Sequence, residues 1–275
     1  MTSYFRNLEL DDWEQFTILD SQAFRRDPIS KEDFIARHDK YIGLFNQEHV
    51  NRLIGYIYCR IYGDYSHLHR ICVLNSEQGK GYGQKLMNKA QEFFKSNNVP
   101  NFALYVETNN NKAINLYKKN NLVISAESWH YIIDTDRFNS NILLKLNLED
   151  KNVRELTLNE IYSLKTIFPD INFPEIENQF KEEQSKINRS NLFLGLFIDS
   201  DLKAFAKFNP EFSGSRPFVY NNIEDVNIFI ALLMNYKLSD KKILRFTFDN
   251  YKNLANYFDS QNYVKHHHLY KMVKK

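Results

Sequence analysis

The chain has 275 residues, of which 43% are hydrophobic and 25% are charged, and its net charge at pH 7 is only +2. These values are typical of a globular protein with room for one large or two medium domains, and we expect two. No basic block interleaved with aromatic residues occurs, so the charge pattern gives no indication of nucleic-acid binding. Neither an apolar run of 18 residues nor a signal peptide is recognisable, so we expect no membrane span and a cytoplasmic location.

The two cysteines, Cys59 and Cys72, lie inside separate apolar segments that resemble strands. Cysteines placed in this way are typical of buried thiols in a reducing compartment, and they do not indicate a disulfide framework.

Apolar periodicity and turn residues predict a mixed order of helices and strands in the first half of the chain. Strands are expected over residues 3–9, 41–46, 52–62, 65–73, 102–107, 122–134 and 141–148, helices over 10–24, 30–40, 81–97 and 111–120, and a turn at 63–64. A first domain is accordingly predicted over residues 1–148.

A similar order begins again after the charged segment 149–152, which is a candidate linker. Strands are expected over residues 153–156, 192–198, 202–208, 218–220, 243–248 and 263–272, and helices over 159–168, 174–187, 224–236 and 252–260. We therefore predict a second domain over residues 149–275 that is built like the first.

Three of the eight glycines, Gly79, Gly81 and Gly83, fall within five positions, between a strand-like run and a helix-like run. Glycine tolerates positive φ and lets backbone NH groups approach a ligand, and a helix that begins after such a loop presents free NH groups to an anion. The loop is therefore predicted to hold a pyrophosphate. Its spacing fits neither the Walker pattern nor the dinucleotide pattern G-x-G-x-x-G.

The sequence from Gln78 to Gly83, Gln-Gly-Lys-Gly-Tyr-Gly, resembles the Q/R-x-x-G-x-G/A signature of the GNAT superfamily, the acetyl-CoA-dependent N-acetyltransferases. Residues 104–117 are similar to a second segment of that family, L-x-V-x-x-x-N-x-x-A-x-x-L-Y. The Gly-Phe pair that usually follows is Asn121-Leu122 here, and asparagine is the usual substitute for glycine at a helix end. The resemblance covers about residues 1–148.

This resemblance implies an α/β fold with a mixed, mostly antiparallel central sheet flanked by helices. It also implies transfer of the acetyl group of acetyl-CoA to a primary amine by direct attack. The acceptor would be a small-molecule or peptide amine, which the sequence does not identify.

The resemblance further implies which residues hold the co-substrate. The backbone of the strand before the loop would pair with the pantetheine arm like an added strand and polarise the acetyl carbonyl, while loop NH groups would hold the pyrophosphate. The expected acetyl-CoA-binding residues are Ile71, Cys72, Val73, Gln78, Gly79, Lys80, Gly81, Tyr82, Gly83, Gln84 and Asn110. Lys80 either adds positive charge to the loop or is simply solvated.

His67 and His69 are candidate general bases, because they alternate on one face of the strand that enters the loop. An imidazole with a pKa of about 6.5 suits the removal of a proton from an ammonium group. The run His67-Leu68-His69 is similar to the paired strand histidines of arylalkylamine N-acetyltransferases, but a structural pair is an equal alternative. No third ligand for a metal is evident, so no metal site is predicted.

Two further residues are candidates for proton transfer. Several relatives carry a glutamate base where this chain has Tyr105, and Glu107 on the same strand face could replace it. Tyr117 matches the family tyrosine, and its phenol, with a pKa of about 10, could protonate a departing thiolate with a pKa of about 8.5. Tyr117 could alternatively be a tyrosine of the core.

The second half lacks the residues of this chemistry. Its corresponding loop, residues 221–225, has no glycine and carries Glu224 and Asp225, while Phe258 stands where the first half has Tyr117. We therefore expect a catalytic first domain and a degenerate second one. Two other functions stay open: a non-catalytic acyl-CoA-binding or sensing module, and a tandem acyl or aminoacyl transferase that acts on a macromolecule.

Overall fold

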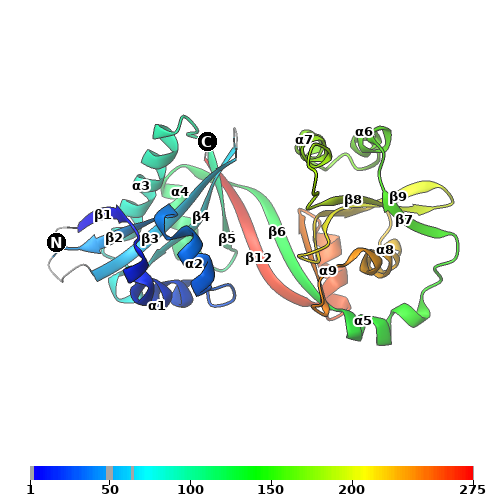
Figure 1. Cartoon of the computed structure of the whole chain (residues 1–275), viewed down its shortest axis with the longest axis horizontal. Coiled ribbons are helices and arrows are strands. Elements are labelled where there is room, and N and C mark those ends of the chain that lie inside the picture. The colour runs from blue at the N-terminus through cyan, green and yellow to red at the C-terminus, as the bar shows by residue number, and fades with distance from the viewer. Residues whose placement is uncertain (1–2, 48–51, 63–64, 275) are drawn as a thin grey trace. The chain divides into compact units, whose positions relative to one another are not determined.

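The computed structural model describes residues 3–47, 52–62 and 65–274 (Figure 1). It divides the chain into two compact units, Met1–Ala126 with Tyr270–Lys275, and Glu127–Leu269. The turn predicted at 63–64 lies outside the described residues.

The first unit is a mixed sheet in which the strand neighbours follow the order β1-β2-β3-β4-β5-β12-β6. Strands β1 to β4 are antiparallel, whereas β5 runs parallel to β4. Its elements are β1 (Ser3–Asn7), α1 (Trp13–Ala23), α2 (Lys31–Arg37), β2 (Tyr41–Asn46), β3 (Arg52–Tyr62), β4 (Tyr65–Val73), α3 (Tyr82–Ser96), β5 (Phe102–Glu107) and α4 (Asn111–Lys119), with the beginning of β6 (Leu122–Asp134) and the end of β12 (Val264–Lys274). The helices and strands predicted for residues 3–134 are confirmed, with small shifts at their ends.

Helices cover both faces of this sheet (Figure 1). Leu86 and Met87 of α3 pack with Ile57 of β3 on one face, whereas Phe16 of α1 packs with Tyr56 of β3 on the other. Because successive strand residues point to opposite faces, this alternation along β3 separates two core layers. No helix in the described part of either unit is long and apolar enough to cross a membrane.

The second unit repeats this order of elements, as the sequence predicted. Its strand neighbours follow the order β12-β6-β11-β10-β9-β8-β7. Its elements are the end of β6, α5 (Thr135–Asn141), β7 (Lys151–Glu155), α6 (Leu158–Ile167), α7 (Phe173–Gln184), β8 (Leu192–Ile198), β9 (Asp201–Asn209), β10 (Gly214–Tyr220), α8 (Asp225–Leu233), β11 (Ile243–Asp249), α9 (Lys252–Ser260) and the beginning of β12.

Two long strands each belong to both units. Strand β6 begins in the first unit and ends in the second, and β12 begins in the second and ends in the first. Within the first unit the end of β12 lies between β5 and β6, and within the second the end of β6 lies between β11 and β12. Each sheet is thus completed by a strand from the other half of the sequence, so the units divide at Ala126 rather than after residue 148.

The prediction of a strand over residues 141–148 is wrong. This segment contains the end of α5 and a 3-10 turn, Leu143–Lys145, and its apolar residues Ile142 and Leu143 pack against the core of the second unit. A short apolar run does not by itself distinguish a strand from a helix. The sheet position that this strand would have filled is occupied by β12.

Met272, near the end of β12, provides a test of this exchange. It is fully buried in the core of the first unit together with Leu86 and Phe94. We expect Met272→Ala to lower the free energy of unfolding by about 2–5 kcal/mol, because the truncation leaves a cavity. Urea denaturation measures the loss, and amide hydrogen exchange should become faster in α3 rather than in α8.

Val264→Ala is the matched control, because Val264 lies on the same strand with 59% of its surface exposed. It should change stability by no more than about 0.5 kcal/mol. Equal losses in the two variants would contradict the placement of the chain end in the first core.

Candidate active site

The candidate site begins where β4 and β5 stop being neighbours. The two strands pair only at Ser66↔Phe102 and His67↔Ala103. Strand β4 continues to Val73, and there it remains paired with Gly55 of β3. In the described part of the chain the second half of β4 therefore has a strand neighbour on one side only. Its other edge, which includes the predicted residues Ile71, Cys72 and Val73, can accept an extended ligand by strand addition.

The glycine loop follows directly after this open edge. Gly79 has φ +81° and Gly81 has φ +85°, a conformation that side chains other than glycine rarely adopt. Apart from the glycine itself and the two adjacent residues, no heavy atom of the described chain lies within 4 Å of the position that a Cβ would take at either glycine. Gly81 is also the N-cap of α3, whose first NH groups have no partner within the helix. The loop thus fits an anion such as pyrophosphate.

Gly83 has a different role, because it lies inside the first turn of α3. A Cβ at this position would lie 3.2 Å from Cδ2 of Leu116 on α4. Glycine here therefore allows the two helices to approach closely.

Polar side chains of the loop bind mainly to the protein itself. The Nζ of Lys80 lies 3.0 Å from Oε2 of Glu77, so its charge is partly offset. The amide of Gln78 donates to the carbonyl oxygen of Val73 at 3.3 Å and to Oδ1 of Asn75 at 3.1 Å. These bonds hold the loop against the end of β4, so its backbone NH groups remain the candidate groups for binding an anion.

Gln84 and Asn110 likewise have structural partners. Nε2 of Gln84 donates to Oδ1 of Asn120 at 2.7 Å, which ties α3 to the end of α4. Oδ1 of Asn110 accepts from the backbone NH of Ala113 at 3.1 Å and so caps α4. The cap fixes the start of the helix that carries Tyr117.

Tyr117 lies in the core between α3 and α4, with 5% of its surface exposed. Burial, together with the nearby Cys72, raises the pKa of Tyr117 above its ordinary value. The phenol therefore keeps its proton at neutral pH, as a general acid must. Burial also raises the pKa of Cys72 well above its ordinary value, so this thiol does not form the thiolate that a nucleophile needs.

His67 and His69 lie side by side, with ring centroids 4.4 Å apart. A bulge contributes to this arrangement, because Tyr58 pairs with Arg70 and Cys59 with Leu68, which leaves His69 as the extra residue. His67 is buried, whereas His69 is exposed at the surface of the face that carries α1 and α2.

Aromatic and cationic groups surround the two imidazoles. The ring of His67 lies 5.5 Å from that of Tyr105, and the ring of His69 lies 5.5 Å from that of Tyr58. The pKa of His69 is lowered to about 4. Desolvation of its ring is the main cause, and the positive charges of Arg60, Arg70 and Arg37 add to it. His69 is therefore neutral and able to accept a proton at pH 7, but it is a weaker base than the unperturbed imidazole that we expected.

Glu107, the alternative base, is half-buried at the end of β5. Its backbone carbonyl accepts from the NH of Asn110, which closes the turn into α4. The structure thus places Glu107 beside the carboxyl end of β5, and the histidines near the point where β4 and β5 part.

A buried ion pair that sequence reasoning missed fixes the segment between α1 and α2. Asp20, with 1% of its surface exposed, accepts from Nη1 of Arg70 at 2.7 Å, from the hydroxyl of Tyr56, and from the NH of Ile29 at 2.7 Å. Nη2 of Arg70 also lies 3.2 Å from the carboxylate of Asp27. The sequence signal for this pair was an aspartate at an apolar position of a helix, four residues after Phe16.

In the second unit the two parallel strands also separate early, but the glycine loop is absent from residues 221–225. Strands β10 and β11 are parallel at Gly214↔Arg245 and Ser215↔Phe246 only. Helix α8 begins at Asp225 with Glu224 as its N-cap, so two carboxylates stand at the start of the helix, where they oppose the binding of an anion. Phe258 is fully buried in the core and carries no hydroxyl group.

Residues 4–121 match the model of the Acetyltransferase (GNAT) family, so the first unit contains an acetyltransferase domain of this family. No curated protein sequence matches the chain significantly.

Solved structures show that the fold of the whole chain also occurs in other proteins. It is similar to a GCN5-related N-acetyltransferase from Sphaerobacter thermophilus, with a TM-score of 0.65, 10% identity, and coverage of 99% of this chain and 95% of that one. It is also similar to a glucosamine N-acetyltransferase region of a fungal multi-domain GH3 β-N-acetylglucosaminidase, with a TM-score of 0.62, 14% identity, and coverage of 99% and 38%. At these identities the likeness concerns the fold alone.

Asp20→Ala tests the ion pair that holds the segment between α1 and α2. The variant leaves the guanidinium of Arg70 without its buried partner, so we expect a loss of about 3–5 kcal/mol in the free energy of unfolding. Urea denaturation measures the loss, and limited proteolysis should detect faster cleavage between residues 24 and 30.

The control is Glu14→Ala, which removes an exposed carboxylate from the same helix. It should behave like the wild type in both assays. If Asp20→Ala is equally harmless, the network does not hold the segment in place.

Proposed function

We propose that the first unit transfers the acetyl group of acetyl-CoA to a primary amine by direct attack, and that the second unit does not bind CoA. One observation carries this proposal: the open edge of β4 leads directly into a loop with two left-handed glycines at the start of α3. The family of residues 4–121 supports the same reaction.

The backbone of the first unit would bind the co-substrate. NH groups from Gly79 to Gln84 would hold the pyrophosphate, with Tyr82 and Gly83 in the first turn of α3. Backbone groups of Ile71 and Val73 at the open edge of β4 would hold the pantetheine arm. When bound, acetyl-CoA supplies an activated acetyl group as a thioester.

The acceptor amine must lose a proton before it attacks, because an alkylammonium with a pKa of about 10.4 is mostly protonated at pH 7. We assign this step to the histidine pair, His67 and His69, whose rings lie together on one face of the sheet. The low pKa of His69 keeps its imidazole free of a proton at neutral pH. Glu107 is the second candidate for the base.

Tyr117 is the proposed general acid. The leaving thiolate has a pKa of about 8.5, below that of a phenol, so it takes a proton only from a donor that is held beside it as the charge develops. The pKa of Tyr117 is raised by burial, so the donor is fully protonated over the working range of pH. Direct attack is favoured over a cysteinyl intermediate, because the buried thiol of Cys72 stays protonated.

Tyr117→Phe tests the acid. We expect kcat to fall by about 10² to 10⁴, because the hydroxyl acts only as the thiolate leaves. The affinity for acetyl-CoA should change little. Release of free thiol from acetyl-CoA, followed at saturating substrates from pH 6 to 9, measures the rate.

Tyr270→Phe is the control for this variant, because Tyr270 also packs against the core of the first unit. It should keep the wild-type kcat. A Tyr117→Phe enzyme that is as fast as the control would remove Tyr117 from the mechanism.

The number of CoA molecules bound per chain tests the assignment of the two units. Calorimetry should find one equivalent of CoA for the wild type, and no binding for Gly81→Val, because valine disfavours the φ of +85° that the loop requires. Asp225→Asn, at the start of α8, should still bind one equivalent. Two equivalents for the wild type, or residual tight binding to Gly81→Val, would show that the second unit has its own donor site.

A further inference from the structure

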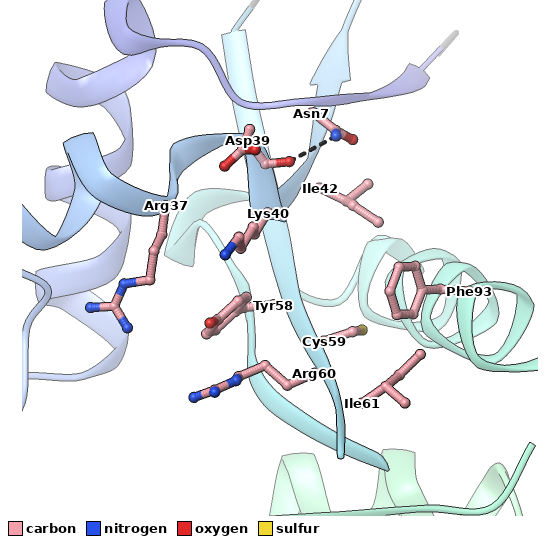
Figure 2. Close-up of a pocket in the computed structure, with 10 residues that line it drawn as sticks. All are labelled: Asn7, Arg37, Asp39, Lys40, Ile42, Tyr58, Cys59, Arg60, Ile61 and Phe93. Atoms are coloured by element: carbon pink, nitrogen blue, oxygen red, sulfur yellow. Dashed lines mark hydrogen bonds between the residues drawn. The ribbon is translucent and has the colours of Figure 1, made fainter. Parts of the chain in front are cut away.

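A pocket of about 590 Å³ opens in the first unit where β3 extends past the beginning of β2 (Figure 2). Strand β2 begins at Tyr41, opposite Tyr58, so residues 59–62 of β3 have only β4 as a strand neighbour in the described chain. The pocket is lined by Asn7, Arg37, Asp39, Lys40, Ile42, Tyr58, Cys59, Arg60, Ile61 and Phe93.

The pocket has a cationic side and an apolar side. Figure 2 shows the side chains of Arg37, Lys40 and Arg60 extending to the same side as Tyr58. Ile42, Cys59 and Ile61 extend to the other side of the strands, where Phe93 points toward them from α3.

Cations outnumber carboxylates in this lining. Asp39 is the acidic residue among the lining residues, against the three cations. Arg37 also forms an ion pair with Asp33, whose side chain is 55% exposed, so part of the arginine charge is offset in solvent. The lining nevertheless keeps a net positive charge.

The cationic side lies next to the proposed base. Arg60 is opposite His67 in the register of β3 and β4. The charges of Arg60 and Arg37 both contribute to the lowered pKa of His69, after the burial of its ring. Arg70 has the same effect but is bound to Asp20, so it belongs to the structural network.

We propose that this pocket binds an anionic group, a carboxylate or a phosphate, carried by the amine that accepts the acetyl group. The inference rests on the proposed function and narrows its substrate class. The volume of the pocket suits a small molecule. Guanidinium groups bind carboxylate and phosphate through paired hydrogen bonds.

This charge pattern also disfavours other acceptors. An amine without an anionic group brings only a positive charge to Arg37, Lys40 and Arg60, and like charges repel each other. Polyamines and arylalkylamines are therefore expected to be poor acceptors, although the histidine pair is similar to that of the arylalkylamine enzymes.

Matched pairs of acceptors test the proposal. The pairs are cadaverine and lysine, tyramine and tyrosine, and glucosamine and glucosamine 6-phosphate, and kcat/KM is measured with acetyl-CoA. The anionic member of at least one pair should be preferred by about tenfold or more, the effect of one charge-assisted hydrogen bond. The first two pairs report a carboxylate site and the third a phosphate site.

Arg60→Gln and Lys40→Gln should each lower this preference by about tenfold, because each removes one cation from the pocket. Lys31→Gln is the matched control, since Lys31 is an exposed cation of α2 outside the lining. Preference for the members that lack an anionic group, or a preference that the pocket variants leave unchanged, would overturn the proposal.

A binding experiment separates this inference from the proposed function. If no amine is acetylated, the proposed function fails, but the pocket can still be tested by calorimetric titration with inorganic phosphate and with succinate. At least one of these anions should bind to the wild type and bind about tenfold more weakly to Arg60→Gln. If neither anion binds, or both bind equally to the two proteins, the pocket is not an anion site.

Discussion

The early parting of β4 from β5 is the constraint on which the candidate site depends. The parallel ladder ends at His67 and Ala103, and beyond this point β4 is paired with β3 alone. Backbone NH and carbonyl groups require partners, so the open edge favours an extended ligand. Because β4 and β5 are parallel, their carboxyl ends lie at the same side of the sheet, where α3 and α4 begin. The topology thus brings the glycine loop and Tyr117 to this opening.

The proposed donor and acceptor sides of the opening are built from different groups. On the donor side the predicted contacts are backbone NH groups, freed by Gly79 and Gly81 with positive φ. On the acceptor side they are side chains, placed by the bulge at His69 and by the buried pair of Asp20 and Arg70. A donor site made of backbone depends on few residue types, whereas the proposed acceptor side depends on the charges of individual side chains.

Local motifs made most of the first unit predictable. The bounds of β4 and β5 and the positive φ of Asn121 follow from short segments whose own residues determine their conformation. The exchange of β6 and β12 was not predictable. Nothing in residues 141–148 shows that β12, about 120 residues further along the chain, occupies the position between β5 and β6. A short apolar segment adopts the structure that the rest of the fold allows.

The electrostatics of the site could also not be predicted from the sequence. Imidazole alone suggested a base with a pKa of about 6.5. The pKa of His69 is lower mainly because its ring is partly buried. The charges of Arg60, on the neighbouring strand, and of Arg37, which is distant in the sequence, lower it further. Cations that come together only in the folded chain do not form a sequence motif, so the cationic pocket could be recognised only in the structure.

A crystal structure of the chain with bound CoA would test the central claim most directly. We expect one CoA molecule in the first unit, with its pyrophosphate at the NH groups of Gly79 to Gln84 and its pantetheine arm along Ile71 to Val73. CoA bound at the start of α8, or bound in the first unit away from the edge of β4, would contradict it.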